Sequence, residues 1–190
     1  MDGDRQSAAP ARVFVGRRPE LGALAVALAA ARAGEPHVVL VQGEAGIGKS
    51  SLIFEFAGSQ SGVPAIIASG EAAEAALPYG VVQQLAAAAS PGVLAGLGLL
   101  SRGPPGGADP LAVGVELLAL ISALQGDDAA VLVIEDLQWA DLPSARALLF
   151  ACRRLAADRV LVVLSCRPEG MARLGQGWAV SPVATAAHLG

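Results

Sequence analysis

Residues 37–51 read HVVLVQGEAGIGKSS, an apolar run followed at once by a glycine-rich loop. The run 37–42 is rich in β-branched residues and shows no polar alternation, which is typical of a parallel strand buried on both faces. Residues 50–60, after the loop, repeat apolar side chains at helical spacing. A strand, a glycine loop and a helix in this order predict a loop that binds phosphate.

The loop fits the pattern GxxxxGK[ST], in which each residue type has a chemical reason. Its glycines allow tight turns and a close approach to an anion, and the loop N–H groups and the helix N-terminus point at the phosphates. Lys49 places a charge on the β and γ phosphates, and the Ser50 hydroxyl can ligate Mg²⁺. A chance glycine loop before a helix is the alternative, and a full match directly behind a strand argues against it.

Two carboxylates end the apolar run VLVIED at 131–136. Because ligands bind at the C-terminal edge of parallel sheets, carboxylates at this point are suited to nucleotide chemistry. We assign Glu135 to the metal and its water shell, and Asp136 to the attacking water. A strand that simply ends in acidic residues before a turn is the alternative, and the phosphate loop makes the functional interpretation the better one.

Arg167 follows a further run of this kind, RVLVVLSC at 159–166. If that strand lies between the strand of the phosphate loop and the VLVIED strand, its end faces the γ-phosphate. An arginine there can report whether the terminal phosphate is present. The alternative is an exposed arginine in the turn before Pro168. The predicted catalytic residues are therefore Asp136, Lys49 and Arg167.

Helical and strand-like segments alternate along the rest of the chain, which predicts an α/β fold with a parallel sheet. Further strands are expected at 63–69, 131–134, 160–165 and 178–180, the last of them followed by a short helix. Helices are expected from 19 to 33, over much of 78–125 with breaks at 90–92 and 102–110, and at 142–157, which Asp141 would cap. We expect residues 1–11 to be a disordered leader and residues 12–190 to form the domain.

Composition narrows the functions open to this domain. Of its 190 residues, 54% are hydrophobic and 16% are charged, and the net charge is −4. The scattered basic residues argue against this segment gripping nucleic acid. The apolar stretches are too short or too interrupted to span a bilayer. We therefore expect a cytoplasmic protein without a membrane partner. Cys152 and Cys166 lack CxxC spacing and a nearby His cluster, and the helical spacing of Cys152 with Leu148 and Leu149 favours a reduced core cysteine.

FVGRRPEL, GEAGIGKS, VLVIEDLQWAD and LVVLSCRPEG, in this order, together resemble the N-terminal ATPase core of large ATP-binding transcriptional regulators of the LuxR type. These regulators belong to the signal-transduction ATPases with numerous domains (STAND), a branch related to AAA+ proteins. The resemblance covers residues 12–190. The FVGR start and the DLQWAD segment narrow it beyond the phosphate loop, which a very large superfamily shares.

The resemblance implies a P-loop NTPase fold with a five-stranded parallel sheet in the order 5-1-4-3-2, flanked by helices. It implies ATP and Mg²⁺ as ligands, Ser50 and Glu135 at the metal, and Arg167 as the γ-phosphate sensor. The nucleotide-binding residues that it implies are Val15, Gly16 and Arg17 on the adenine side, with Gly43, Glu44, Ala45, Gly46, Ile47, Gly48, Lys49, Ser50 and Ser51 in the loop. This chain departs from the family at Arg18, Glu135 and Gln138, where an acidic residue, aspartate and histidine are usual.

In the family, the lid, the sensor repeats and the helix-turn-helix follow this core. Since residues 12–190 match the core alone, we expect a core without its lid. DNA would then be contacted only through a C-terminal domain outside this chain. The leading hypothesis is an ATP-binding switch with slow Mg-dependent hydrolysis. ATP would order one arrangement of core and lid, ADP would favour another, and nucleotide-dependent self-association is a further expectation. A non-hydrolysing nucleotide-binding or assembly module is the alternative. A small-molecule kinase is less favoured, because the second carboxylate of VLVIED suits a water nucleophile.

Overall fold

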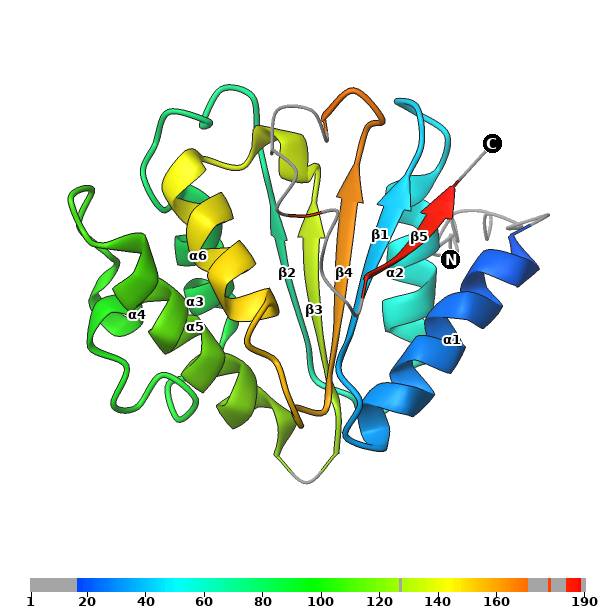
Figure 1. Ribbon diagram of the computed structural model, residues 1–190, viewed down its shortest axis with the longest axis horizontal. Helices are drawn as coiled ribbons and strands as arrows, with labels where there is room; N and C mark the ends of the chain where they lie inside the picture. Colours follow the sequence, from blue (N-terminus) through cyan, green and yellow to red (C-terminus); the bar gives the residue numbers. More distant parts are fainter. Residues whose placement is uncertain (1–16, 127, 171–177, 179–183, 189–190) are drawn as a thin grey trace, which may run out of the picture.

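The computed structural model describes residues 17–126, 128–170, 178 and 184–188, so the leader expected at 1–11 lies outside the described residues. The described chain forms a five-stranded sheet in the order β2-β3-β4-β1-β5, and its hydrogen-bonded strand pairs are parallel. The strand arrowheads in Figure 1 accordingly point towards one edge. The strands are β1 (His37–Gln42), β2 (Ala65–Ser69), β3 (Ala130–Glu135), β4 (Val160–Cys166) and β5 (Ala184–His188).

The α/β fold predicted from alternating helical and strand-like segments is confirmed, with a parallel sheet and flanking helices. Read from the β5 edge, the observed strand order is 5-1-4-3-2, the order that the resemblance implies. β4 therefore lies between β1 and β3, as the interpretation of Arg167 requires. All residues of β3 and β4 are buried, which explains their uninterrupted apolar sequences.

The expected position of the fifth strand is wrong. It was expected at 178–180 with a short helix after it, whereas β5 is Ala184–His188 and Trp178 lies outside any strand. β5 pairs with β1 from Val38↔Ala184 to Gln42↔His188. The run ATAAH has little β propensity of its own, so pairing with the edge of β1 opposite β4 decides its conformation.

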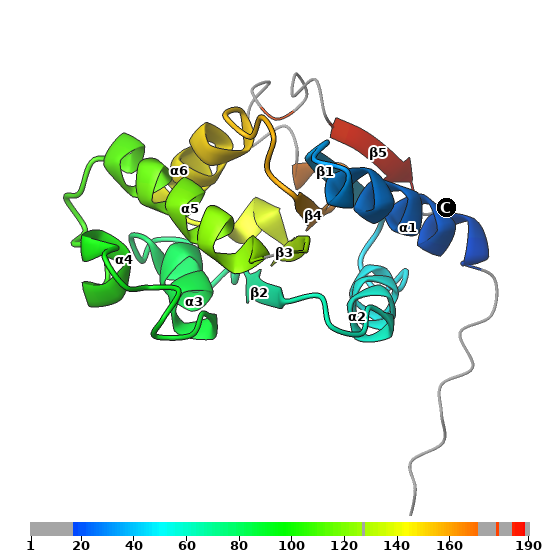
Figure 2. The ribbon, with the colours of Figure 1, turned by 90° about the horizontal axis from the view of Figure 1, so that it is seen from below.

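Helices cover both faces of the sheet, and alternate residues of β3 point to different helices. Val131 and Val133 belong to the hydrophobic cluster of α1 and α2, while Leu132 and Ile134 belong to that of α3, α5 and α6. Figure 2 shows α1 and α2 on one side of the sheet and the other helices on the opposite side. The helices are α1 (Arg18–Arg32), α2 (Lys49–Ser59), α3 (Gly80–Ala88), α4 (Gly98–Arg102), α5 (Pro110–Gln125), the 3₁₀ turn η1 (Leu137–Trp139) and α6 (Leu142–Cys152).

Two smaller expectations have different outcomes. The helix expected at 142–157 ends at Cys152, because the chain turns there to enter β4 at Val160. Cys152 is free and buried, as expected of a core cysteine, and burial raises its pKa to about 12. Cys166 is also free and buried. Among the described residues, no helix combines the length and the apolar character needed to cross a membrane.

Asp141 caps α6, as its position in the sequence predicts, and also joins α6 to a helix 60 residues earlier. Its buried carboxylate accepts from the N–H of Ser144 and of Tyr79 at 2.8 Å, and from that of Val81 at 3.4 Å. Tyr79 and Val81 lie at the start of α3. One carboxylate thus satisfies N–H groups at the N-termini of two helices, which fixes where the η1 turn leaves the sheet edge.

Asp141→Ala is expected to lower the free energy of unfolding by about 3 kcal/mol, because three buried N–H groups lose a charged acceptor. Asp109→Ala is the matched control, since Asp109 caps α5 by one exposed hydrogen bond to Leu111. That control should cost about 1 kcal/mol. Chemical denaturation of the two variants measures the difference, and equal losses would show that Asp141 is an ordinary single cap.

Candidate functional site

The glycine loop connects the end of β1 to the start of α2. Gly46 and Gly48 have φ of 77° and 98°, a left-handed backbone region that glycine adopts without a steric cost. The N–H of Gly43 donates to the carbonyl of Cys166 at 3.4 Å, which ties the start of the loop to the end of β4. α2 begins at Lys49, so its first N–H groups face the loop and form an anion-binding end.

The Lys49 side chain is buried over the loop. Its Nζ donates to the carbonyls of Gly43 at 2.9 Å and of Glu44 at 3.0 Å. Because an ammonium group carries three N–H bonds, these two contacts still allow it to donate to a phosphate oxygen. The lysine is therefore held at the loop by its own backbone and is positioned to neutralise an anion there.

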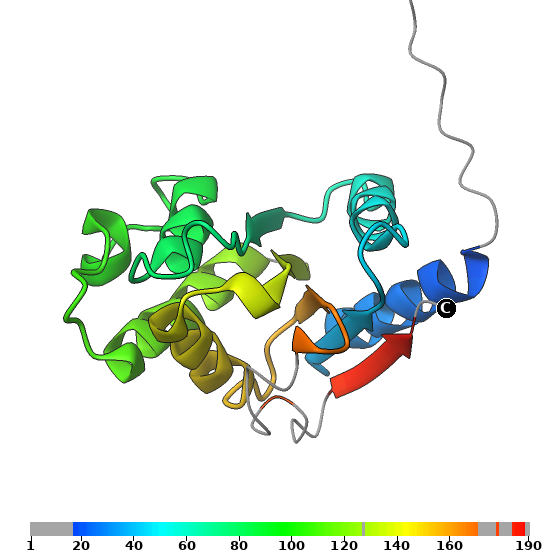
Figure 3. The same ribbon diagram turned by 90° about the horizontal axis from the view of Figure 1, so that it is seen from above.

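A cavity of about 250 Å³ opens over the loop and brings three of the sequence motifs together. Asp136 follows β3 and Arg167 follows β4, and both reach the cavity because these strands are neighbours with parallel pairing. Figure 3 looks onto this edge of the sheet, where the ends of the two strands lie side by side. The lining residues are Ala45, Gly46, Gly48, Lys49, Ser50, Ser51, Asp136 and Arg167.

Asp136 has an unusual backbone conformation. Its φ of 46° and ψ of 47° lie in the left-handed region, which costs a non-glycine residue about 1 kcal/mol or more. Its N–H donates to the Ser165 hydroxyl at 3.0 Å, and its carbonyl accepts from the N–H of Trp139 at 2.8 Å. The chain thus leaves the strand geometry at Asp136, and this carboxylate lines the cavity.

Glu135 lies beside the cavity rather than in its lining. Alternation along β3 puts Glu135 on the face of Val131 and Val133, which is the face covered by α2. Its side chain is buried, and within the described part of the chain its Oε1 has no hydrogen-bond partner. An unpaired buried carboxylate oxygen is costly, and the water shell of a Mg²⁺ ion held by Ser50 would supply the missing donors.

The donor set suits a metal ion that is shared with a nucleotide. Among the described residues, no group of three or more His, Cys, Asp or Glu side chains could hold a metal ion by itself. Magnesium in phosphoryl-transfer sites is bound by one or two protein oxygens, several waters and the substrate phosphates. Ser50 and Glu135 fit that description.

The adenine-side motif is described only at Arg17, since Val15 and Gly16 lie outside the described residues. Arg17 Nη1 donates to Glu20 Oε1 at 3.1 Å, and its Nη2 donates to the carbonyl of Ile47 at 3.2 Å. A backbone hydrogen bond at the start of α1, and then Arg17, lower the pKa of Glu20. Arg17 therefore joins α1 to the phosphate loop, and its contact with a base stays a prediction.

Two residues at this edge have contacts that the sequence patterns did not reveal. Ser165 accepts from the N–H of Asp136, and the Gln138 amide bonds to both Asp136 and Arg167. The sequence marks Gln138 only as a departure from the histidine that is usual at this position in the LuxR-type regulators. These hydrogen bonds, two of them from a backbone N–H to a side chain, have no periodicity in the sequence, so spacing gave no signal for them.

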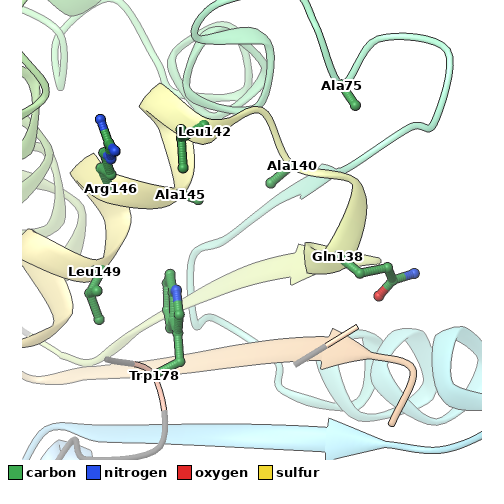
Figure 4. Close-up of a pocket in the computed structure, with 8 residues that line it drawn as sticks. All are labelled: Ala75, Gln138, Ala140, Leu142, Ala145, Arg146, Leu149 and Trp178. Carbon is green, nitrogen blue, oxygen red and sulfur yellow. The ribbon is translucent and has the colours of Figure 1, made fainter. Parts of the chain in front are cut away.

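A second cavity, of about 460 Å³, lies on the other side of Gln138. Figure 4 shows Trp178 rising towards Leu149 of α6, while the Gln138 amide points away from both. Arg146 is the only formally charged residue in the described lining, so this cavity lacks the paired acid and base groups of the first one. Its lining is Ala75, Gln138, Ala140, Leu142, Ala145, Arg146, Leu149 and Trp178.

Solved structures with a similar fold include a signal-transduction ATPase with numerous domains (STAND) and chains of the Drosophila ORC. The chain is similar to the STAND protein with a tetratricopeptide repeat sensor from Pyrococcus horikoshii, at 20% identity and a TM-score of 0.55. The match covers 96% of this chain and 24% of that one. It is also similar to chains of two structures of the Drosophila ORC. One is bound to AT-rich DNA and Cdc6, with 13% identity, a TM-score of 0.55, and 90% of this chain and 57% of that one covered.

The second ORC structure, of ORC bound to DNA, matches at 13% identity and a TM-score of 0.55, with 90% of each chain covered. A comparison with curated protein sequences gives no significant match. The family model for the AAA ATPase domain matches residues 13–163, which include the phosphate loop, the acidic pair and most of β4. The chain therefore belongs to the AAA ATPase domain family.

Proposed function

We propose that this domain is an ATP-binding switch that hydrolyses ATP slowly in the presence of Mg²⁺. The observation that carries the proposal is the convergence of Lys49, Ser50, Asp136 and Arg167 on one cavity above a glycine loop. A switch that hydrolyses ATP needs groups for the phosphates, the metal ion and the attacking water, and a group at the γ-phosphate that distinguishes ATP from ADP. Only the order of the parallel strands puts them within reach of one ligand.

Each residue has a separate part in this proposal. The loop N–H groups and Lys49 bind the phosphates, and Ser50 with Glu135 hold the Mg²⁺ ion, which neutralises charge on the transferred phosphoryl group. Asp136 orients the attacking water. Arg167, at the end of β4, contacts the γ-phosphate, so its surroundings change when that phosphate is released.

The wider context is proposed from resemblance. The P. horikoshii neighbour combines its ATPase with a tetratricopeptide repeat sensor, which supports a similar switch role here within a longer regulator of the LuxR type. DNA contact would belong to a domain outside this chain. The ORC neighbours are parts of an assembly, which supports nucleotide-dependent self-association as a consequence of ATP binding. Adenine contacts from Val15, Gly16 and Arg17 belong to the same proposal.

Lys49→Ala is expected to weaken ATP binding at least about 100-fold, because charge-assisted contacts to two phosphates are lost. Arg153→Ala removes an exposed cation just after α6 and serves as the control that should bind normally. Isothermal titration calorimetry with Mg-ATP measures both. Unchanged affinity in Lys49→Ala would remove the basis for placing the nucleotide at this loop.

Asp136→Asn is expected to bind ATP within about threefold of the wild-type affinity and to lower turnover about 100-fold, as for loss of a general base. Asparagine also tolerates the left-handed backbone of this position, so the loop geometry should survive. Asp109→Asn is the matched control, an exposed carboxylate outside the cavity where asparagine caps equally well. Phosphate release is measured over many turnovers, and undiminished release in Asp136→Asn would exclude this role.

A further inference from the structure

We propose that Gln138 is a positioning residue that holds the Asp136 carboxylate and the Arg167 main chain in a fixed relation and thereby sets the rate of ATP turnover. The rate part rests on the proposed function. The contact itself does not, because it joins the ends of β3 and β4 whether or not nucleotide is hydrolysed.

Both ends of the Gln138 amide are used. Its Nε2 donates to Asp136 Oδ1 at 2.8 Å, and its Oε1 accepts from the N–H of Arg167 at 3.1 Å. Asp136 and Arg167 both line the cavity over the phosphate loop. One side chain therefore connects the residue assigned to water with the residue assigned to the γ-phosphate.

The surroundings leave Gln138 little freedom to move. It is 6% exposed, and a Cβ on Gly170 would lie 2.5 Å from the Gln138 Cβ, so the chain after β4 closes on it through a glycine. On the β2 side, a Cβ on Gly70 would lie 2.6 Å from the carbonyl oxygen of Asp136. The turn that carries Asp136 and Gln138 is thus enclosed between two glycines.

A bond of this kind controls orientation. An ionised carboxylate accepts hydrogen bonds at both oxygens, so the contact to Oδ1 limits rotation of the Asp136 side chain while Oδ2 can accept from a water. Misplacement of a catalytic group by about 1 Å can cost about 100-fold in rate. The N–H contact likewise fixes the point from which the Arg167 side chain extends.

The structure offers a matched control in Gln84. Its Nε2 donates to the carbonyl of Ser69 and its Oε1 accepts from the N–H of Ser69, both at 2.9 Å. Gln84, on α3, therefore also uses both ends of its amide, in its case to bind the backbone of Ser69 on β2. It is outside the lining of the nucleotide cavity. Gln84→Leu removes two hydrogen bonds of the same kind without touching Asp136 or Arg167.

Gln138→Leu is expected to lower ATP turnover at least tenfold while the affinity for ATP stays within threefold. Gln138→Glu keeps an acceptor for the Arg167 N–H but puts a carboxylate against Asp136, so its turnover should fall at least as far. In an Asp136→Asn background, Gln138→Leu should lower turnover by a smaller factor than it does in the wild type, because part of its effect acts through Asp136. Gln84→Leu should reduce thermal stability comparably and leave turnover unchanged.

Hydrogen exchange at the Arg167 amide gives a readout that needs no nucleotide. Exchange should accelerate at least tenfold in Gln138→Leu, stay slow in Gln138→Glu and be unchanged in Gln84→Leu. A wild-type chain that binds ATP but releases no phosphate would contradict the proposed hydrolysis and the rate part of this inference, and the Arg167 exchange would then decide the contact itself. Turnover within twofold of wild type in Gln138→Leu, or an equal loss in Gln84→Leu, would overturn the positioning role.

Discussion

The candidate site depends on the position of β4, which pairs in parallel with β1 on one side and with β3 on the other. Its register matches Gln42 with Cys166 and Leu164 with Ile134, so the three strands end at one edge of the sheet. Because parallel strands share a direction, whatever follows each of them in the sequence is brought together in space. Another order of the same strands would leave the phosphate loop, Asp136 and Arg167 apart.

Buried apolar strands set the sheet, and a few polar contacts then set the site. The left-handed conformation of Asp136 is held by Ser165 and by the turn that Gln138 and Asp141 stabilise. Strained backbone of this kind persists only where its surroundings over-determine it. The hydrogen bonds at the ends of β3 and β4 supply that constraint. They fix the residues just beyond the two strands relative to the sheet.

Much of this arrangement could be predicted because it rests on local pattern. β1, β3 and β4 are apolar runs typical of a buried parallel strand, and the glycines, the lysine and the serine of GEAGIGKS each have a chemical reason. The site residues that follow these strands were found because they stand at strand ends. The rest depends on tertiary contacts without local signals. β5 is an alanine-rich run that pairing with β1 makes a strand, Arg17 bonds to Ile47 across 30 residues, and Gln138 bonds across the ends of two strands.

We propose that one Mg-nucleotide site forms where β1, β3 and β4 end, and that Ser50 and Glu135 would hold the metal ion there. Electron paramagnetic resonance with Mn²⁺ in place of Mg²⁺ examines this site, because couplings to phosphorus nuclei report direct contact between the metal ion and the nucleotide. We expect one Mn²⁺ ion per chain that binds only with ATP, shows phosphorus couplings and is bound more weakly in Glu135→Gln. Binding of Mn²⁺ without nucleotide, or with ATP but without phosphorus couplings, would contradict it.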